Sequence, residues 1–179
     1  MNGKRIAAAL LLLLAFMARA FAQESQLSDE QMLGVVFVAN QAEIAAANLA
    51  LRKTRSNSLQ VFAKRIVSEH AQVNQEIFTL TQRFGTRPQR SATSDALTKQ
   101  SNDDLAELDQ TSTYDFDEAY LEHEIVFLQK LINTVEGYIR TARSAEARTL
   151  LIRSRPSFIF HLDQAQRLQI TIGSPGLIR

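Results

Sequence analysis

Residues 57–85 read NSLQVFAKRIVSEHAQVNQEIFTLTQRFG, and this stretch decides the fold class. Its apolar side chains recur every three or four residues, the spacing that places them on one face of an α-helix. Asn57 and Ser58 are typical of a helix start, and Gly85 is typical of the residue just after a helix end. We therefore expect one long amphipathic helix, with an apolar stripe made of Leu59, Phe62, Ile66, Val73, Ile77, Leu80 and Phe84.

Three further segments show the same periodicity. The first is predicted over residues 28–55, where Ser28 followed by Gln31 is a capping-box start. Another opens at Asp115 and carries an apolar seam as far as Ile139. The last is predicted over residues 144–172 and contains Pro156, which is expected to kink or restart the helix because proline lacks an N–H donor.

A polar stretch, residues 86–113, connects the second and third of these helices. A helical piece around residues 95–108 fits within it. Connections of this length are unusual in compact bundles, and the simplest use is a crossover that runs the length of the bundle. We predict an all-α, ferritin-like four-helix bundle with a long crossover between helices 2 and 3. The alternative is a plain up-down bundle with a disordered middle loop.

The N-terminal residues have the three parts of a secretory signal. Lys4 and Arg5 precede an apolar run over residues 6–17, and Ala20-Phe21-Ala22 is an A-x-A cleavage site. The apolar run is shorter than the ~20 residues that span a bilayer. We expect residues 1–22 to be a signal peptide, residues 23–172 the bundle domain and residues 173–179 a flexible tail. An uncleaved membrane anchor is the alternative.

Composition narrows the class of protein further. Residues 1–22 hold three basic residues and no acidic one, which leaves 17 basic against 19 acidic residues in the remainder. Such a balance argues against binding nucleic acid, which needs a basic excess. The absence of cysteine excludes both disulfides and a lipoprotein anchor. We expect a single exported domain in the periplasm, associated with the outer membrane or free.

Four polar residues interrupt the apolar stripes near the middle of their helices. They are Glu43, His70, Glu124 and His161, and Asn40 lies one turn before the first of them. In an antiparallel bundle, mid-helix residues meet at one level, so the four side chains are predicted to converge. One hypothesis is a site for a divalent metal or a proton, because carboxylates and imidazoles form such sites in bundle cores. The other is a hydrogen-bonded polar layer that sets helix register.

Enzymatic chemistry has little support in the sequence. A ferritin-type di-iron site needs Glu-x-x-His on two helices, and the chain contains no such motif. Glycine-rich phosphate loops and nucleophile elbows are also absent. His123 lies off the Leu121/Ile125/Leu128 seam and is predicted to be on the surface.

A basic run crosses the last predicted loop and enters the last helix. One interpretation is a solvated face, and the other is a patch for an anionic lipid or a cell-envelope polymer. The run consists of Arg140, Arg143, Arg148, Arg153 and Arg155.

Several motifs, in order, resemble the domain of unknown function 4142 family. Residues 61–70, VFAKRIVSEH, resemble its V-x-x-F-A-x-x-M-V-x-D-H motif, with Ile66 for the methionine and Glu69 for the aspartate. Residues 116–121, FDEAYL, resemble F-D-x-x-Y, and residues 156–165 resemble P-x-x-x-x-H-L-x-x-A. The likeness covers residues 29–168. It implies a ferritin-like bundle in exported bacterial proteins, often labelled outer-membrane proteins, with no established activity.

The chain departs from this family pattern at one position. The family usually has a histidine eight residues after the tyrosine, where this chain has Leu128. His123 cannot replace it, because five residues turn a helix by about 140°. Our leading hypothesis is a non-enzymatic bundle with an interaction or stress-related role, whose partner is an envelope component or a second copy. The second is a metal-binding or redox protein using Glu43, His70 and His161, with Glu124 or Glu69.

Overall fold

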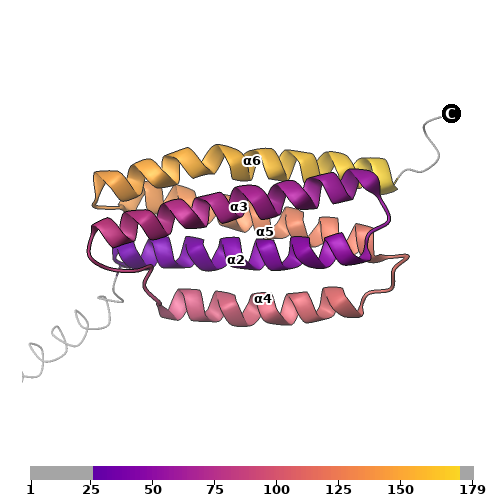
Figure 1. The fold of residues 1–179 in the computed structure, drawn as a ribbon, viewed down its shortest axis with the longest axis horizontal. Helices are drawn as coiled ribbons and strands as arrows, with labels where there is room; N and C mark the ends of the chain where they lie inside the picture. The colour runs from indigo at the N-terminus through magenta and orange to yellow at the C-terminus, as the bar shows by residue number, and fades with distance from the viewer. Residues whose placement is uncertain (1–25, 174–179) are drawn as a thin grey trace, which may run out of the picture.

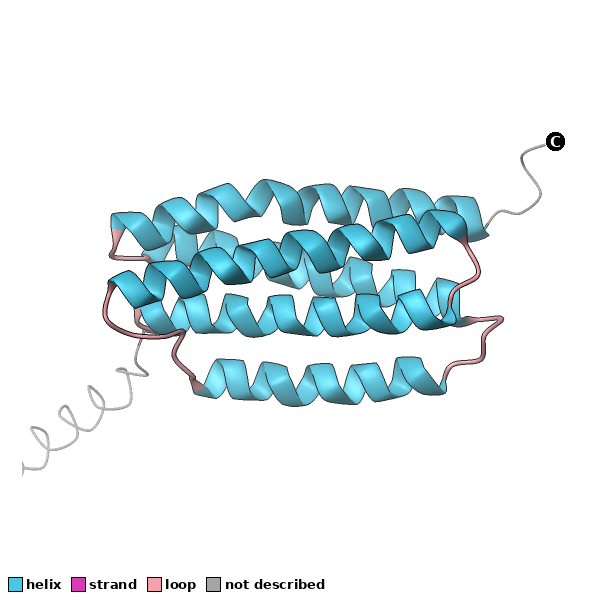
Figure 2. Ribbon diagram, viewed as in Figure 1, coloured by secondary structure: helices cyan, strands magenta, loops and turns pink. Residues whose placement is uncertain are grey.

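The computed structural model describes residues 26–173. These residues form helices joined by short loops and contain no strand (Figure 2). The helices are α2 (Asp29–Lys53), α3 (Asn57–Arg83), α4 (Ala92–Gln110), α5 (Phe116–Thr141) and α6 (Ala145–Gly173). The all-α prediction is confirmed. The predicted signal peptide, residues 1–22, lies outside the described residues, as does the predicted tail after Gly173.

Four of the helices pack as a ring of antiparallel neighbours. α2 pairs with α3 and α5 pairs with α6, each through a short loop, and the ring closes where α3 contacts α6 and α2 contacts α5 (Figure 1). The bounds of these four helices match the predicted segments to within two residues at each end. The ring therefore follows from the four amphipathic stripes recognised in the sequence.

Besides the four predicted helices, the described residues hold a fifth, α4, which contains the helical piece expected around residues 95–108. The stretch of residues 86–113 holds α4, so it is not a disordered loop. α4 runs back along the bundle beside α2 and brings the chain from the end of α3 to the start of α5 (Figure 1). Ser91 and Ser94 start it with a capping box, a signal that a polar composition concealed.

Both ends of α4 are tied to α2. At its start, Gln89 N–H donates to the Glu30 carbonyl at 3.0 Å, and the Gln89 backbone lies so close to Gly34 that a Cβ there would be 2.0 Å from the Gln89 oxygen. At its end, Lys53 Nζ donates to the carbonyl of Thr111 at 2.8 Å. A cation suits a helix C-terminus, where carbonyls are unpaired. α4 is thus a docked element that covers one flank of the ring.

The predicted helix ends are confirmed, and of the two outcomes expected at Pro156 a restart of the helix does not occur. Ser28 and Gln31 form the capping box of α2. Gly85 follows α3 with φ 72, the left-handed conformation that glycine adopts without strain. α6 continues through Pro156 without a restart. Ile152, four residues before the proline, is the residue whose carbonyl loses its helical donor, and it is half exposed.

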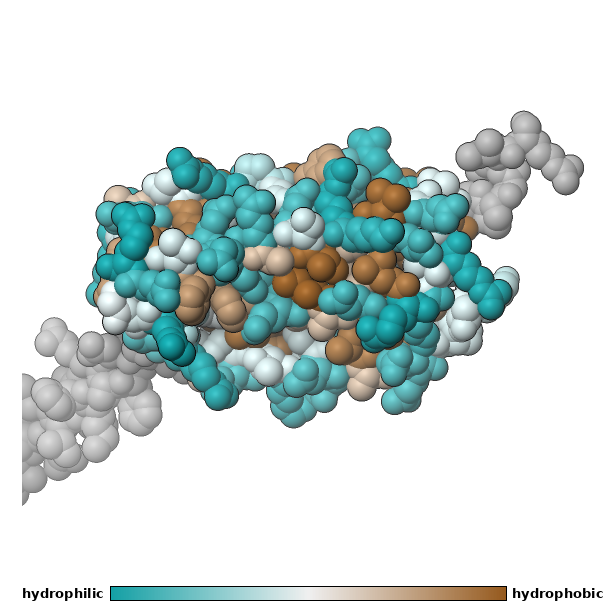
Figure 3. All heavy atoms as spheres, viewed as in Figure 1, coloured by the Kyte–Doolittle hydropathy of each residue, from teal (hydrophilic) through white to brown (hydrophobic). Residues whose placement is uncertain are grey.

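The surface is mixed in polarity. On the face shown in Figure 3, apolar side chains gather near the middle, over α2 and α3, among polar ones. α2 itself is long and apolar enough to meet a membrane-span criterion, but most of that stretch is buried inside the bundle. Its hydrophobicity is therefore explained by the core.

Candidate metal centre

A polar layer divides the apolar core of the bundle into two halves. One half is built around Leu33, Ile77 and Leu151, and the other around Leu59 and Leu121. Between them lie fully buried polar side chains, each with 0% exposure: Asn40, Glu43, His70, Glu124 and His161. Buried polar groups are costly unless they are paired, so each of them needs a partner within the layer.

Helical spacing places these side chains in the layer. Asn40 and Glu43 are three residues apart and share the inward face of α2. His70 continues the buried stripe of α3 between Ile66 and Val73. Because neighbouring helices are antiparallel and nearly equal in length, their midpoints meet at one depth. As predicted, the mid-helix polar residues converge, and they do so in this layer.

The histidines belong to one chain of close polar contacts across three helices. His70 Nδ1 lies 2.8 Å from Asn40 Oδ1, and His70 Nε2 lies 3.2 Å from His161 Nδ1. His161 Nε2 lies 2.9 Å from Oε2 of Glu69, whose side chain is 38% exposed. The chain therefore runs from the buried centre to the surface of α3. Burial lowers the pKa of His70 to about 3, and burial also lowers the pKa of His161, so both imidazoles are held neutral near pH 7.

The carboxyl groups of Glu43 and Glu124 form a second part of the layer. All four of their oxygens and the hydroxyl of Tyr120 are buried without a hydrogen-bond partner outside this group. Burial raises the pKa of Glu43 well above its usual range, and the neighbouring Glu124 raises it further. Burial likewise raises the pKa of Glu124 to about 7. Within the group, a hydrogen bond between the two carboxyl groups raises the pKa of Glu43, and hydrogen bonds from Glu43 and Tyr120 act to lower the pKa of Glu124. Two carboxyl groups this close cannot both ionise without a cation.

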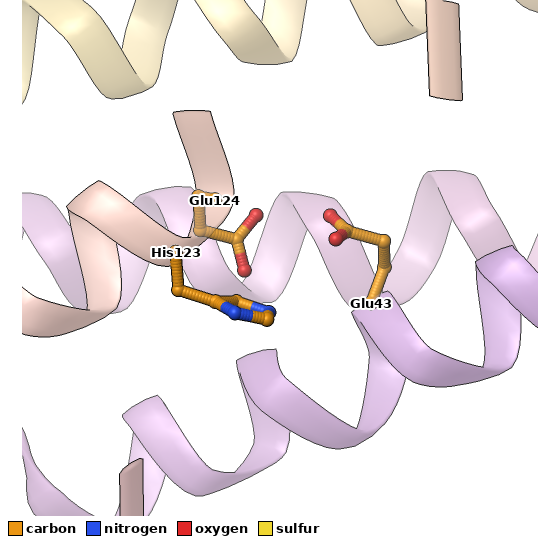
Figure 4. Close-up of side chains that lie close together, drawn as sticks. All are labelled: Glu43, His123 and Glu124. Atoms are coloured by element: carbon orange, nitrogen blue, oxygen red, sulfur yellow. The ribbon is translucent and has the colours of Figure 1, made fainter. Parts of the chain in front are cut away.

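His123 does not lie on the open surface, so the sequence prediction for it was wrong. It is partly buried, and a nitrogen of its ring lies within 4.8 Å of carboxylate oxygens of both Glu43 and Glu124. Figure 4 shows His123 and Glu124 reaching from α5 towards the Glu43 carboxyl on α2. Burial lowers the pKa of His123, while Asp104 of α4 acts in the opposite direction.

The reason for this error is α4. Judged against the α5 seam alone, residue 123 falls outside the core face. However, α4 packs beside α2 and also contacts α5, so the covered face of α5 is wider than one seam. Buried Tyr120 and Phe127, three residues before and four after His123, are the sequence signal that marks this wider face.

The structure brings the four predicted residues together: Glu43 lies near both His70 and Glu124, and His161 contacts His70. Glu43 Oε2 lies 4.0 Å from His70 Nε2, His70 contacts His161, and Glu124 belongs to the cluster of Glu43 and His123. Sequence reasoning missed His123 and the buried Asn74, which accepts from Asn40 Nδ2 at 2.9 Å. Leu128, where the family pattern has histidine, is fully buried and supplies no donor atom.

The predicted basic run is partly engaged within the molecule. Arg155 pairs with Glu136 across α5 and α6, and Arg148 donates to the carbonyl of Ala142, at the end of α5. These two arginines hold the hairpin of α5 and α6 together. Binding of an anionic polymer by this run stays a prediction.

Comparison with known proteins places the chain in a family. The family model described as "Domain of unknown function (DUF4142)" matches residues 16–168. The chain belongs to the DUF4142 family. This confirms the resemblance drawn from the residues of α3, α5 and α6. A search of curated proteins found no significant match.

Solved structures similar to this DUF4142 protein share its fold. CopM in the Cu(I)-bound form superposes with a TM-score of 0.66 at 18% identity, over 80% of this chain and 96% of CopM. CopM in the Cu(II)-bound form has a TM-score of 0.66 at 17% identity, over 82% of this chain and 98% of CopM. At this level of identity the likeness concerns the helical fold.

Proposed function

We propose that this DUF4142 chain is an exported, ferritin-like helical bundle that binds a divalent transition metal in its core without catalysing a reaction. The observation that carries the proposal is the pair of fully buried carboxyl groups, Glu43 and Glu124, whose oxygens have no hydrogen-bond partner beyond each other and Tyr120. A nitrogen of His123 completes a set of donor atoms within 4.8 Å of one another.

The energetics of burial favour a cation at this point. A buried carboxylate without a hydrogen bond or a counter-charge costs several kcal/mol. No lysine or arginine in residues 26–173 lies within 4.0 Å of Glu43 or Glu124, and the nearest basic group to Glu43 is the neutral His70. In the metal-free protein, bound protons relieve this cost, and the raised pKa values of both carboxyl groups keep such protons up to neutral pH. A divalent ion would relieve the cost in place of those protons.

The donor atoms select the class of metal. The site offers two carboxylates and an imidazole, which suit borderline divalent ions such as Zn²⁺ and Cu²⁺. Soft ligands are scarce: the chain has no cysteine and three methionines, of which Met1 and Met17 precede the described residues. Met32, the third, is buried in the apolar half of the core. The similar fold of copper-bound CopM agrees with a metal role, but this donor set favours Cu²⁺ over Cu⁺.

Storage or buffering of metal in the cell envelope is a non-enzymatic, stress-related role that fits this site. Export rests on the signal-like residues 1–22. The ferritin-like description is supported by the path of α4, which returns the chain so that α3 and α5 run in the same direction (Figure 1). Partners, whether an envelope component or a second copy, stay predictions.

The test is metal analysis of protein purified without an affinity tag. After treatment with a chelator, the protein is incubated with Zn²⁺ or Cu²⁺, desalted and analysed by mass spectrometry of the bound element. We expect at least one ion per chain and a higher Tm, because binding to the folded state alone stabilises it. Glu43→Gln and Glu124→Gln should each lower the affinity by tenfold or more.

Glu118→Gln is the matched control, because Glu118 is an exposed carboxylate on the same helix as Glu124. It should bind metal like the wild type. A wild-type protein with no stoichiometric metal and no change in Tm would contradict the proposal.

A further inference from the structure

The hydrogen-bond partners of Asn74 and Asn40 determine which nitrogen of His70 carries its proton. Asn74 Nδ2 donates to the carbonyl of Phe37 at 3.2 Å, so Asn74 Oδ1 is the atom that accepts from Asn40 Nδ2. Asn40 Oδ1 therefore faces His70 Nδ1 and can only accept. His70 Nδ1 must carry the proton, which leaves a lone pair on His70 Nε2.

Glu69 determines the proton of His161 in the same way. Its Oε2 accepts from the Ser157 hydroxyl and lies 2.9 Å from His161 Nε2. A carboxylate only accepts, so His161 Nε2 carries the proton. A neutral His161 then has its lone pair on Nδ1, and that atom faces His70 Nε2 across 3.2 Å.

Two lone pairs held face to face repel each other, and a cation bound by both nitrogens, either a proton or a metal ion, relieves this repulsion. The two rings are nearly parallel, with an angle of 27° between their planes and 5.2 Å between their centroids. Two ligand atoms on one tetrahedral ion with bonds of 2.0–2.1 Å are about 3.3 Å apart, close to the distance found here. Each imidazole also donates its other N–H to an oxygen, which is the arrangement that orients metal-binding histidines.

From this geometry we infer that His70 and His161 form a metal position of their own, which shares Glu43 with the cluster of Glu43, Glu124 and His123. Glu43 Oε2, 4.0 Å from His70 Nε2, supplies the negative charge. Asn40 and Glu69 are positioning residues, because they hold the two lone pairs inward without lying at the ion. The inference rests on the proposed metal function, and it adds a second ion of the same divalent class.

Stoichiometry and spectroscopy separate the two positions. We expect the untagged, chelator-treated protein to take up two Zn²⁺ per chain. His161→Gln should reduce this to one by removing the histidine-pair position, and His123→Gln should reduce it to one by weakening the other. With Cu²⁺, electron spin-echo modulation should count two coordinated imidazoles in His123→Gln and one in His161→Gln. His70→Gln is an independent second variant, and circular dichroism of each metal-free variant checks its helix content.

Asn40 gives a test of the positioning role. Asn40→Ala should lower the affinity for one of the two ions by 10–100-fold. Asn40→Asp keeps an acceptor oxygen and should retain the wild-type affinity. Asn48→Ala is the control, because Asn48 is an exposed asparagine on the same helix.

The outcomes distinguish this inference from the proposed function. A wild type with one ion that His161→Gln retains would overturn the histidine-pair position and leave the proposed function intact. A wild type with one ion that His161→Gln loses and His123→Gln keeps would support the histidine pair and overturn the role of His123. A wild type that binds no metal would overturn both.

Discussion

Replacement of Glu124 by glutamine should change how the stability of the metal-free protein depends on pH. Burial raises the pKa of the Glu124 carboxyl from its ordinary 4.5 to about 7. Between these two values the folded protein keeps a proton that the unfolded chain has released. The free energy of unfolding therefore falls as the pH rises from 4.5 to 7 and is constant above that range.

The magnitude follows from the width of that interval. One pH unit corresponds to about 1.4 kcal/mol, so Glu124 should remove about 3 kcal/mol of stability between pH 4.5 and pH 8. Glu124→Gln lacks this term because the amide does not ionise. Relative to wild type, the variant should gain at least ~3 kcal/mol over this range, because the substitution also removes the effect by which Glu124 raises the pKa of Glu43. His70, with its pKa lowered to about 3, causes a loss of stability as the pH falls below 6.5, but it is present in both proteins and cancels in the difference.

Urea unfolding followed by circular dichroism at pH 4.5, 6 and 8, with EDTA present, measures this difference. Glu118→Gln should show no such trend, because that carboxylate is exposed on the same helix. Addition of Zn²⁺ at pH 8 should stabilise the wild type more than Glu124→Gln, so the difference between their free energies of unfolding should become smaller. A difference between wild type and Glu124→Gln that stays constant across pH would refute the claim that the buried carboxyl holds a proton at neutral pH.

Three further predictions concern the scaffold and export. Gly34→Ala should destabilise the protein by about 2 kcal/mol or more in urea unfolding, because the new Cβ would clash with the Gln89 backbone, which cannot move aside as a flexible side chain can. A loss of stability below about 0.5 kcal/mol would show that the α3–α4 loop does not pack against Gly34. Gly85→Ala should cost about 1 kcal/mol in the same assay, since φ is 72 and no neighbour blocks the methyl group, whereas an equal stability would exclude strain at this helix end. The intact mass of the exported protein should lack residues 1–22, and a full-length mass would instead indicate an uncleaved anchor.

The helices and their ends were largely predictable from local sequence. The spacing in residues 57–85, the capping pair Ser28 and Gln31, and Gly85 depend on contacts within a few residues, and all reappear in the structure. α4 was harder to predict because its composition is polar and only Ser94 and Leu108 of it are buried. A helix that covers a flank without entering the core carries a weak periodic signal.

The sequence alone determined which polar residues interrupt the apolar stripes at mid-helix, because the spacing of residues along one helix decides which of them share a face. These residues are Glu43, His70, Glu124 and His161. Only the tertiary structure decided which of them touch. Contacts such as His70 with His161 join residues 91 apart, and the burial of His123 depends on α4 covering α5. The tautomers of the two histidines likewise depend on Asn40 of α2 and on Asn74 and Glu69 of α3. These relations arise from helix packing, which no local pattern contains.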